Sequence, residues 1–273
     1  MHGKEQPKKA ETIKPPKIQS RYQVIGDIIL LKMVHNQTQE EKKNMAAYLM
    51  KKFPRIKTVC EMEGVAGELR TPLVKKVAGN GTETIHTEHG IRYTLDVAKV
   101  MFSKGNLSER KRLLAYDMTH ETIIDLFAGI GYFSLGIAKA FPESRVIALE
   151  KNQDAFSYLE KNIVLNHVSN ITPVHADCRD CTQTYANTAD RVLMGYFPHT
   201  EVFLPTAVAV LKNRGMIHFH NTYAASALWD EPRRHLETYA QKLGFRYSVV
   251  KQKIVKSVGP HKVHVVLDVE IEK

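Results

Sequence analysis

From residue 123 onward, short apolar segments alternate with amphipathic segments of helical length, and no other feature constrains the fold as strongly. Strands are predicted at 123–127, 145–149, 171–175, 191–194 and 216–220, with helices at 131–140, 153–166, 200–211 and 231–243. This alternation is typical of a mostly parallel sheet that carries helices on both faces. The last two strands, 245–254 and 263–271, have no helix-length connection between them, so we expect an antiparallel pair.

The chain before this region has a different pattern. A strand is expected at 24–31, a helix at 39–52, and four short strands between 58 and 97 that are separated by glycine-bearing turns. Residues 21–97 are therefore predicted to form a smaller N-terminal α+β module, ahead of a domain at 98–273. Residues 1–20 hold five lysines and three prolines with few apolar side chains, and we interpret them as a flexible basic arm.

The charge balance bears on the partners of the protein. Lys and Arg number 39 against 29 Asp and Glu, a net charge of +10, which is typical of a protein that meets polyanions. The segment 233–262 is especially basic and could contact RNA phosphates through Arg233, Arg234, Lys242, Arg246, Lys251, Lys253, Lys256 and Lys262. A solvated, merely solubilising surface is the alternative reading.

Other classes of protein are disfavoured by composition. No stretch approaches the roughly 18 apolar residues of a membrane helix, and the N-terminus has no signal-peptide core, so a cytoplasmic location is expected. Three cysteines are too few for a disulfide framework, and Cys178 and Cys181 have no second cysteine pair that would complete a zinc site. We expect no metal.

The sharpest local motif is the segment 125–134, with the sequence DLFAGIGYFS. An apolar strand leads into a Gly-x-Gly turn that opens a helix, where a ligand can approach the backbone. Glu150 ends the next strand, where an acidic residue can bind ribose hydroxyls, and Asp177 follows the third strand, where a carboxylate can meet adenine. Because Ser134 replaces the third glycine of the dinucleotide fingerprint, the pattern favours a nucleoside ligand such as S-adenosylmethionine. A tight turn in an ordinary α/β protein is the alternative.

Two segments before this motif make the likeness to a known family specific. Residues 96–103 read DVAKVMFS and residues 106–110 read NLSER. Together with 125–134 they resemble the tRNA position-37 modifying family of class I S-adenosylmethionine enzymes, over about residues 20–273. That family contains guanosine methyltransferases and the wybutosine-pathway aminocarboxypropyltransferases. The resemblance implies a Rossmann-like class I methyltransferase fold and a tRNA substrate.

The loop after the fourth predicted strand discriminates between these activities. The methyltransferases of the family carry an asparagine there, whereas this chain has Gly195 followed by Tyr196, Phe197 and Pro198. That loop, and the segment HFHNT at 218–222, resemble the archaeal aminocarboxypropyltransferases. Because glycine has no side chain, it would leave room for S-adenosylmethionine bound in a different orientation or for a bulkier base. The resemblance thus implies transfer of the 3-amino-3-carboxypropyl group of S-adenosylmethionine to C7 of 4-demethylwyosine at position 37 of tRNA-Phe.

The same resemblance implies roles for individual residues. Contacts to S-adenosylmethionine are expected from Ser103, Arg110, Phe127, Gly129, Gly131, Glu150, Asp177 and Cys178, where the last replaces a family asparagine. The proton lost from the base could be accepted by His199, His220 or Asp177. Arg110 could instead lie on a solvated helix face, and the two histidines could be structural. Methyl transfer at the same tRNA position and a non-catalytic RNA-binding scaffold remain open, and a monomer is expected.

Overall fold

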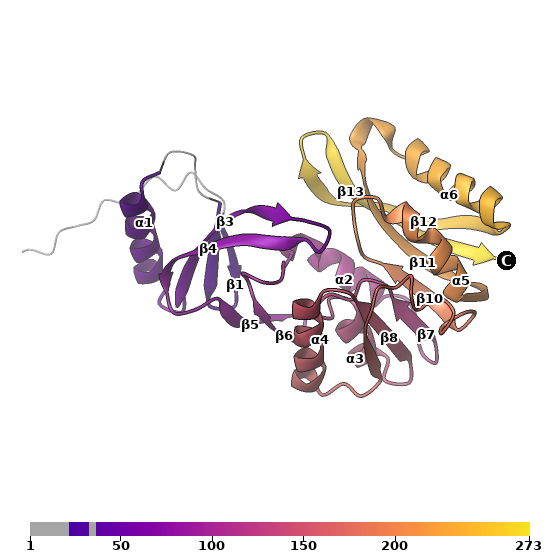
Figure 1. Ribbon diagram of the computed structural model, residues 1–273, viewed down its shortest axis with the longest axis horizontal. Coiled ribbons are helices and arrows are strands. Elements are labelled where there is room, and N and C mark those ends of the chain that lie inside the picture. The colour runs from indigo at the N-terminus through magenta and orange to yellow at the C-terminus, as the bar shows by residue number, and fades with distance from the viewer. Residues whose placement is uncertain (1–21, 33–36) are drawn as a thin grey trace, which may run out of the picture.

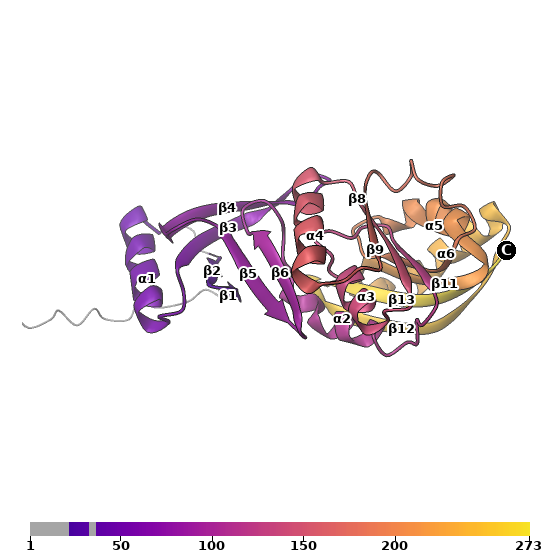
Figure 2. The ribbon, with the colours of Figure 1, turned by 90° about the horizontal axis from the view of Figure 1, so that it is seen from below.

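The computed structural model describes residues 22–32 and 37–273, and the predicted basic arm lies outside them. The chain forms an elongated molecule, with a small N-terminal sheet at one end and a larger sheet with its helices at the other (Figures 1 and 2). None of the helices within the described ranges is long and apolar enough to cross a membrane.

The N-terminal sheet has four strands in the order β1-β2-β3-β4. They are β1 (Tyr22–Ile25), β2 (Ile28–Leu31), β3 (Thr58–Ala66) and β4 (Thr71–Gly79), and α1 (Gln39–Lys52) packs on one face. The single strand predicted at 24–31 is wrong: Gly26 and Asp27 form a turn, so β1 and β2 pair antiparallel. Helix α1 begins at a capping box in which Thr38 and Glu41 satisfy each other's backbone N–H groups.

A hairpin of β5 (Glu83–Glu88) and β6 (Ile91–Asp96) connects the two sheets. Two buried asparagines of α4 (Gln153–Asn166) bind its backbone: Asn162 Oδ1 accepts from Thr94 N–H at 2.7 Å, and Asn166 Oδ1 accepts from Arg92 N–H at 2.8 Å. One continuous apolar core also runs from the N-terminal sheet into the larger sheet. The hairpin was expected in the N-terminal module, but it is attached to the larger sheet and its helices as well.

The larger sheet has seven strands in the order β12-β13-β11-β10-β7-β8-β9. The five strands from β11 to β9 are parallel, while β13 runs antiparallel to β11 and β12. This confirms the predicted antiparallel pair at the C-terminus. The bounds are β7 (Thr122–Asp125), β8 (Arg145–Glu150), β9 (Ile171–His175), β10 (Ala189–Met194), β11 (Leu211–Ala224), β12 (Arg246–Gly259) and β13 (Lys262–Glu272).

Helices cover both faces of this sheet, as predicted. Neighbouring residues of a strand point to opposite faces, so Ile123 packs with α3 (Ser134–Ala140) and α4, whereas Ile124 packs with α5 (Leu204–Val210) and α6 (Asp230–Leu243). Helix α3 begins at Ser134 rather than at 131 as expected. Helix α2 (Leu107–Leu113) precedes β7.

The strand order reverses between β7 and β10. The chain moves from β7 to β8 and β9 on one side, and returns to β10 and β11 on the other. At such a switch point the loops after the strands diverge and leave a crevice at their carboxyl ends, which is where open α/β sheets bind ligands. The topology therefore places the segments after β7, β8, β9 and β10 around one site.

Candidate active site

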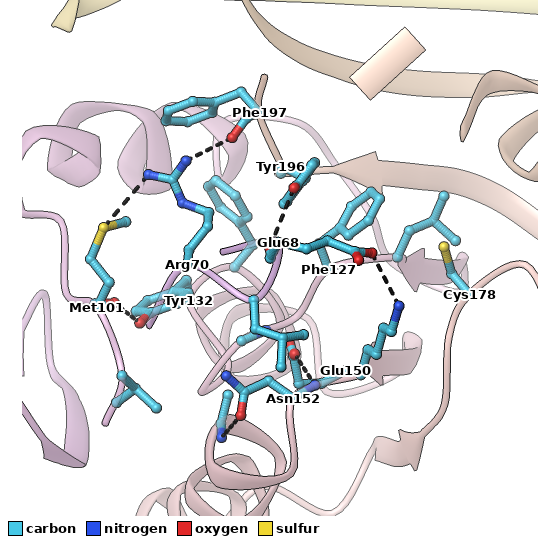
Figure 3. Close-up of a pocket in the computed structure, with 18 of the residues that line it drawn as sticks. Glu68, Arg70, Met101, Phe127, Tyr132, Glu150, Asn152, Cys178, Tyr196 and Phe197 are labelled. Atoms are coloured by element: carbon cyan, nitrogen blue, oxygen red, sulfur yellow. Dashed lines mark hydrogen bonds and ion pairs between the residues drawn. The ribbon is translucent and has the colours of Figure 1, made fainter. Parts of the chain in front are cut away.

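A pocket lies at this switch point. Its walls come from the segments that follow β7, β8, β9 and β10, and the turn between β3 and β4 covers it from the N-terminal module (Figure 3). The predicted site residues that line it are Ser103, Arg110, Phe127, Gly129, Glu150, Asp177, Cys178, Gly195, Tyr196 and Phe197. The fold thus brings together residues that are almost a hundred positions apart in sequence.

Glu150 ends β8 and is held by the surrounding backbone. Its Oε2 accepts a hydrogen bond from Gly129 N–H at 2.7 Å, and its Oε1 accepts one from Asn152 N–H at 2.7 Å. Burial raises the pKa of Glu150, while these N–H groups act in the opposite direction by stabilising the charged form. Each carboxylate oxygen of Glu150 has a further lone pair, so this carboxylate can still accept hydrogen bonds from a ligand in the pocket.

Asp177 and Cys178 follow β9. Asp177 forms ion pairs with Arg179 at 2.6 Å and Lys151 at 3.1 Å. The hydrogen bond from Arg179 is the main reason that the pKa of Asp177 lies well below its usual range. Because the Asp177 carboxylate is so strongly stabilised in its charged form, it is a poor proton acceptor. Burial raises the pKa of the Cys178 thiol to about 12, so this cysteine contributes surface and not a nucleophile.

Gly131 has a different role from the one expected. It does not line the pocket, and a Cβ at this position would lie 2.6 Å from Leu135 Cδ1 and 3.2 Å from Leu159 Cδ1. Its φ of +96° is also one that other residues rarely adopt. This glycine is required by the turn and by packing against the core, and it lies outside the lining of the pocket in which the nucleoside was expected.

The loop after β10 forms the aromatic wall of the pocket. The Phe127 and Tyr196 rings stack with centroids 5.1 Å apart and planes inclined by 26°, and Phe203 meets Phe127 edge-on at 4.9 Å. A Cβ on Gly195 would lie 2.9 Å from Cε2 of Phe133. The space beside Gly195 is thus partly filled by Phe133, rather than open as expected. Pro198 does not line the pocket.

Neither histidine predicted as a proton acceptor reaches the pocket. The side chain of His199 is 81% exposed and lies 3.4 Å from a carboxylate oxygen of Glu201. His220 is fully buried, with Nδ1 3.0 Å from Nε2 of His264, and burial lowers its pKa to about 3. His220 is a neutral core residue and His199 is a surface residue, and neither lines the pocket.

Arg110 is buried and not on a solvated helix face. It donates from Nη1 to Glu88 Oε2 at 2.5 Å and from Nη2 to the carbonyl oxygen of Ser103 at 2.6 Å. Its Nε has no hydrogen-bond partner among the described residues, and neither has Oδ1 of Asn106 on the same wall. Buried polar atoms are nearly always paired. A buried donor and a buried acceptor without partners therefore mark this end of the pocket as a place for a polar ligand.

The N-terminal module and the segment before α2 contribute pocket residues that were not predicted from the sequence. Arg70 donates from Nη1 to the carbonyl oxygen of Phe197 at 2.7 Å, and its guanidinium lies 4.8 Å from the Phe197 ring (Figure 3). Tyr132 donates to the carbonyl oxygen of Met101. Arg70 stands in an ordinary-looking turn that follows Gly67, and no local pattern indicates that it contacts a residue 127 positions away.

The sheet order, the carboxylate at the end of β8 and the pocket at the switch point define an α/β transferase of the class that uses S-adenosylmethionine. Family models agree: residues 84–250 match the TRM5/TYW2 methyltransferase domain, and residues 10–82 match the TYW2 N-terminal domain. The chain belongs to the TRM5/TYW2 family. The N-terminal match ends and the methyltransferase match begins at the start of β5, so nearly all of the β5–β6 hairpin falls in the methyltransferase domain.

Sequence identities to individual members show which branch of the family this chain resembles. The chain is 38% identical to the tRNA(Phe) (4-demethylwyosine(37)-C(7)) aminocarboxypropyltransferase of Methanocaldococcus jannaschii, over 93% of this chain and 98% of the relative. The enzyme of the same name from Pyrococcus horikoshii is 36% identical, over 93% and 90%. The tRNA (guanine(37)-N(1))-methyltransferase Trm5b of Pyrococcus abyssi is 30% identical, over 92% and 74%.

Solved structures show the same similarity. M. jannaschii TYW2 in complex with AdoMet superposes with a TM-score of 0.74 at 35% identity, covering 93% of this chain and all of the other. P. horikoshii TYW2 in complex with MeSAdo gives a TM-score of 0.82 at 34% identity, covering 93% and 91%. The fold of both the catalytic domain and the N-terminal module is thus that of the family.

Proposed function

We propose that this protein transfers the 3-amino-3-carboxypropyl group of S-adenosylmethionine to C7 of 4-demethylwyosine at position 37 of tRNA-Phe. The observation that carries the proposal is the similarity to two aminocarboxypropyltransferases over nearly the whole length of every chain involved. Gly195, at the position where the methyltransferases of the family carry an asparagine, supports it.

The polar groups of the pocket fit this donor. Glu150 offers oriented carboxylate oxygens for the ribose hydroxyls at the adenosine end. At the other end, the unpaired Nε of Arg110 can donate to the donor's carboxylate, and the unpaired Oδ1 of Asn106 can accept from its ammonium group. Ser103 would also contact the donor at this end of the pocket. Phe127, Asp177 and Cys178 would surround the adenine, with Asp177 already held in place by Arg179 and Lys151.

The sulfonium of the donor activates three attached carbons, and the pose of the nucleophile selects one of them. In the proposed reaction C7 of the base forms a bond to the γ-carbon, the bond from that carbon to sulfur breaks, methylthioadenosine leaves, and the C7 proton is lost to a base. This chain's residues fix the pose. The Tyr196 ring, which stacks on Phe127, offers an aromatic surface on which a tricyclic base can stack.

The partner proposed for the protein is the anticodon region of tRNA-Phe, to which it would bind as a monomer. Basic side chains on α6 and β12 that are exposed to solvent, namely Arg233, Arg234, Lys242, Arg246 and Lys251, can neutralise phosphates. Such contacts position an RNA but carry little sequence information. Recognition of the modified base would then depend on the pocket.

The test is to incubate the protein with S-adenosylmethionine and tRNA-Phe that carries 4-demethylwyosine, and to identify the products by mass spectrometry. Methylthioadenosine together with an aminocarboxypropylated base is the expected result. S-adenosylhomocysteine with a methylated base would replace the proposal with methyl transfer, the activity named for a relative from Saccharolobus solfataricus that is 28% identical. No product and no saturable donor binding would indicate a non-catalytic RNA-binding scaffold.

A further inference from the structure

Three cationic side chains converge beside the donor pocket, and they come from three separate parts of the chain. Arg70 lies in the turn between β3 and β4, Arg110 on α2, and Lys256 on the edge strand β12. Arg70 and Arg110 line the pocket. Arg110 and Lys256 bind the same residue: Arg110 donates to the carbonyl oxygen of Ser103 at 2.6 Å, and Lys256 donates to its Oγ at 2.5 Å.

Lys256 is directed inward, although it lies on an edge strand. Its Nζ donates to Ser103 Oγ at 2.5 Å, and Ser103 lines the pocket. Its stem crosses Gly105 so closely that a Cβ there would lie 2.7 Å from Lys256 Cδ. Burial, followed by the charges of Arg70 and Arg110, lowers the pKa of Lys256 to about 8. Within the described residues it forms no ion pair with a carboxylate.

Arg70 also has no carboxylate partner among the described residues. It donates to the carbonyl oxygen of Phe197 and to the sulfur of Met101. Burial lowers its pKa, because the charged form has lost part of its hydration. Arg110 alone has an acidic partner, Glu88. Three cations thus share one carboxylate.

Among the described residues, the neighbouring titratable groups form no ion pair with Arg70 or Lys256: Glu150 lines the same pocket, but its oxygens accept from the N–H groups of Gly129 and Asn152. His264 of β13 lies opposite Lys256 in the sheet register, and burial lowers its pKa so that it stays neutral. Glu68, at the other side of the β3–β4 turn, is paired with Lys151. Desolvated charges in proteins are normally paired or bind a ligand of opposite charge.

We infer that Arg70 and Lys256, together with the free Nε of Arg110, form a binding site for an oxyanion at the edge of the pocket. The inference rests on the proposed function, because that function brings two such groups to this place: the carboxylate of the donor and a phosphodiester of the tRNA. Both accept hydrogen bonds from guanidinium and ammonium groups. The N-terminal module therefore contributes a ligand-binding side chain, Arg70, to the active site.

The experiment compares Lys256→Met with Lys212→Met, a control that removes one exposed charge at the amino end of β11, which is the end of the sheet opposite the pocket. Binding of S-adenosylmethionine, of decarboxylated S-adenosylmethionine and of tRNA-Phe is measured by titration for each variant and the unaltered protein. A lost hydrogen bond between charged groups weakens binding roughly tenfold or more. Lys256→Arg keeps the charge and should retain most of the affinity. Arg70→Met provides a second variant if Lys256→Met does not fold.

The two sources of the anion give different results. If the donor's carboxylate is bound, Lys256→Met weakens S-adenosylmethionine binding at least about tenfold and leaves the decarboxylated analogue unaffected. If a tRNA phosphate is bound, donor affinity is unchanged, whereas tRNA binds more weakly and with a salt slope lower by about 1 than in the control. Donor and tRNA affinities equal to those of the control in both folded variants would overturn the inference. These titrations need no turnover, so a methylated product would refute the proposed function without affecting this result.

Discussion

Neutralising Glu88 tests the view that the buried pair with Arg110 supports the pocket wall. Glu88 is 9% exposed, its Oε2 accepts from Arg110, and its Oε1 lies 3.1 Å from Nε2 of His86. In Glu88→Gln the shape is kept but Arg110 becomes a buried cation without an acidic partner. Removing one member of a buried pair costs about 3–5 kcal/mol, and losing a single hydrogen bond to a charged group about 1.5–3 kcal/mol. Because Gln retains one acceptor, we expect a loss of roughly 2–3 kcal/mol in the free energy of unfolding.

The assay is urea unfolding followed by circular dichroism, with Glu63→Gln as the matched control. Glu63 also forms an ion pair, 2.6 Å from Lys75, but both side chains are exposed. Surface pairs contribute little because water and salt screen them, so the control should unfold at nearly the same urea concentration as the unaltered protein. Equal midpoints for Glu88→Gln and Glu63→Gln would refute the reasoning that burial makes the first pair important.

The same pair predicts a dependence on pH. Burial alone would raise the pKa of Glu88, but the hydrogen bond from His86 and the charge of Arg110 outweigh it and lower the pKa below its ordinary value. A carboxylate with a lowered pKa in the folded state stabilises the fold above its unfolded pKa, and this stabilisation is lost as the pH falls through the folded pKa. Glu88→Gln should therefore reduce the acid sensitivity of unfolding below about pH 4.

Three further predictions concern the pocket. Glu150→Ala should weaken S-adenosylmethionine binding by about 1.5–3 kcal/mol, and unchanged affinity in calorimetric titration would remove Glu150 from the ribose contact. Gly195→Asn should displace the Phe133 ring and slow the reaction, because even a Cβ at this position would lie 2.9 Å from the ring. Mass spectrometry of the by-product shows whether methyl transfer appears. Full aminocarboxypropyl activity in this variant would contradict the packing argument. Cys178 should react slowly with iodoacetamide at pH 8, because its pKa is raised to about 12 and its side chain is buried; rapid labelling of the folded protein would show that the thiol is accessible.

The division between the two modules is less sharp than the change in sequence pattern at residue 97 indicates. Among the strands that the structure describes, β5 and β6 pair only with each other, but Asn162 and Asn166 of α4 bind the backbone of this hairpin. Apolar residues of both modules also form one core. A module that shares a core with its neighbour is held in a defined position. This connection places the β3–β4 turn, with Arg70, over the pocket.

Local sequence was enough to predict the catalytic sheet, the glycine turn after β7, and the carboxylate at the end of β8. These features depend on the periodicity of apolar residues and on the residues that begin or end a helix or strand, and both can be recognised from neighbouring residues in the sequence. The identity of residue 195 likewise indicated which activity within the family to expect.

Contacts between distant segments were decided only by the tertiary structure. Sequence could not show that His220 is enclosed by the core, that Phe133 occupies the space beside Gly195, or that Lys256 turns inward to Ser103. Each of these depends on which side chains a strand or turn meets after the chain has folded back on itself. Burial and pairing of charges are properties of that three-dimensional arrangement, so the sequence could not rank His199, His220 and Asp177 as proton acceptors.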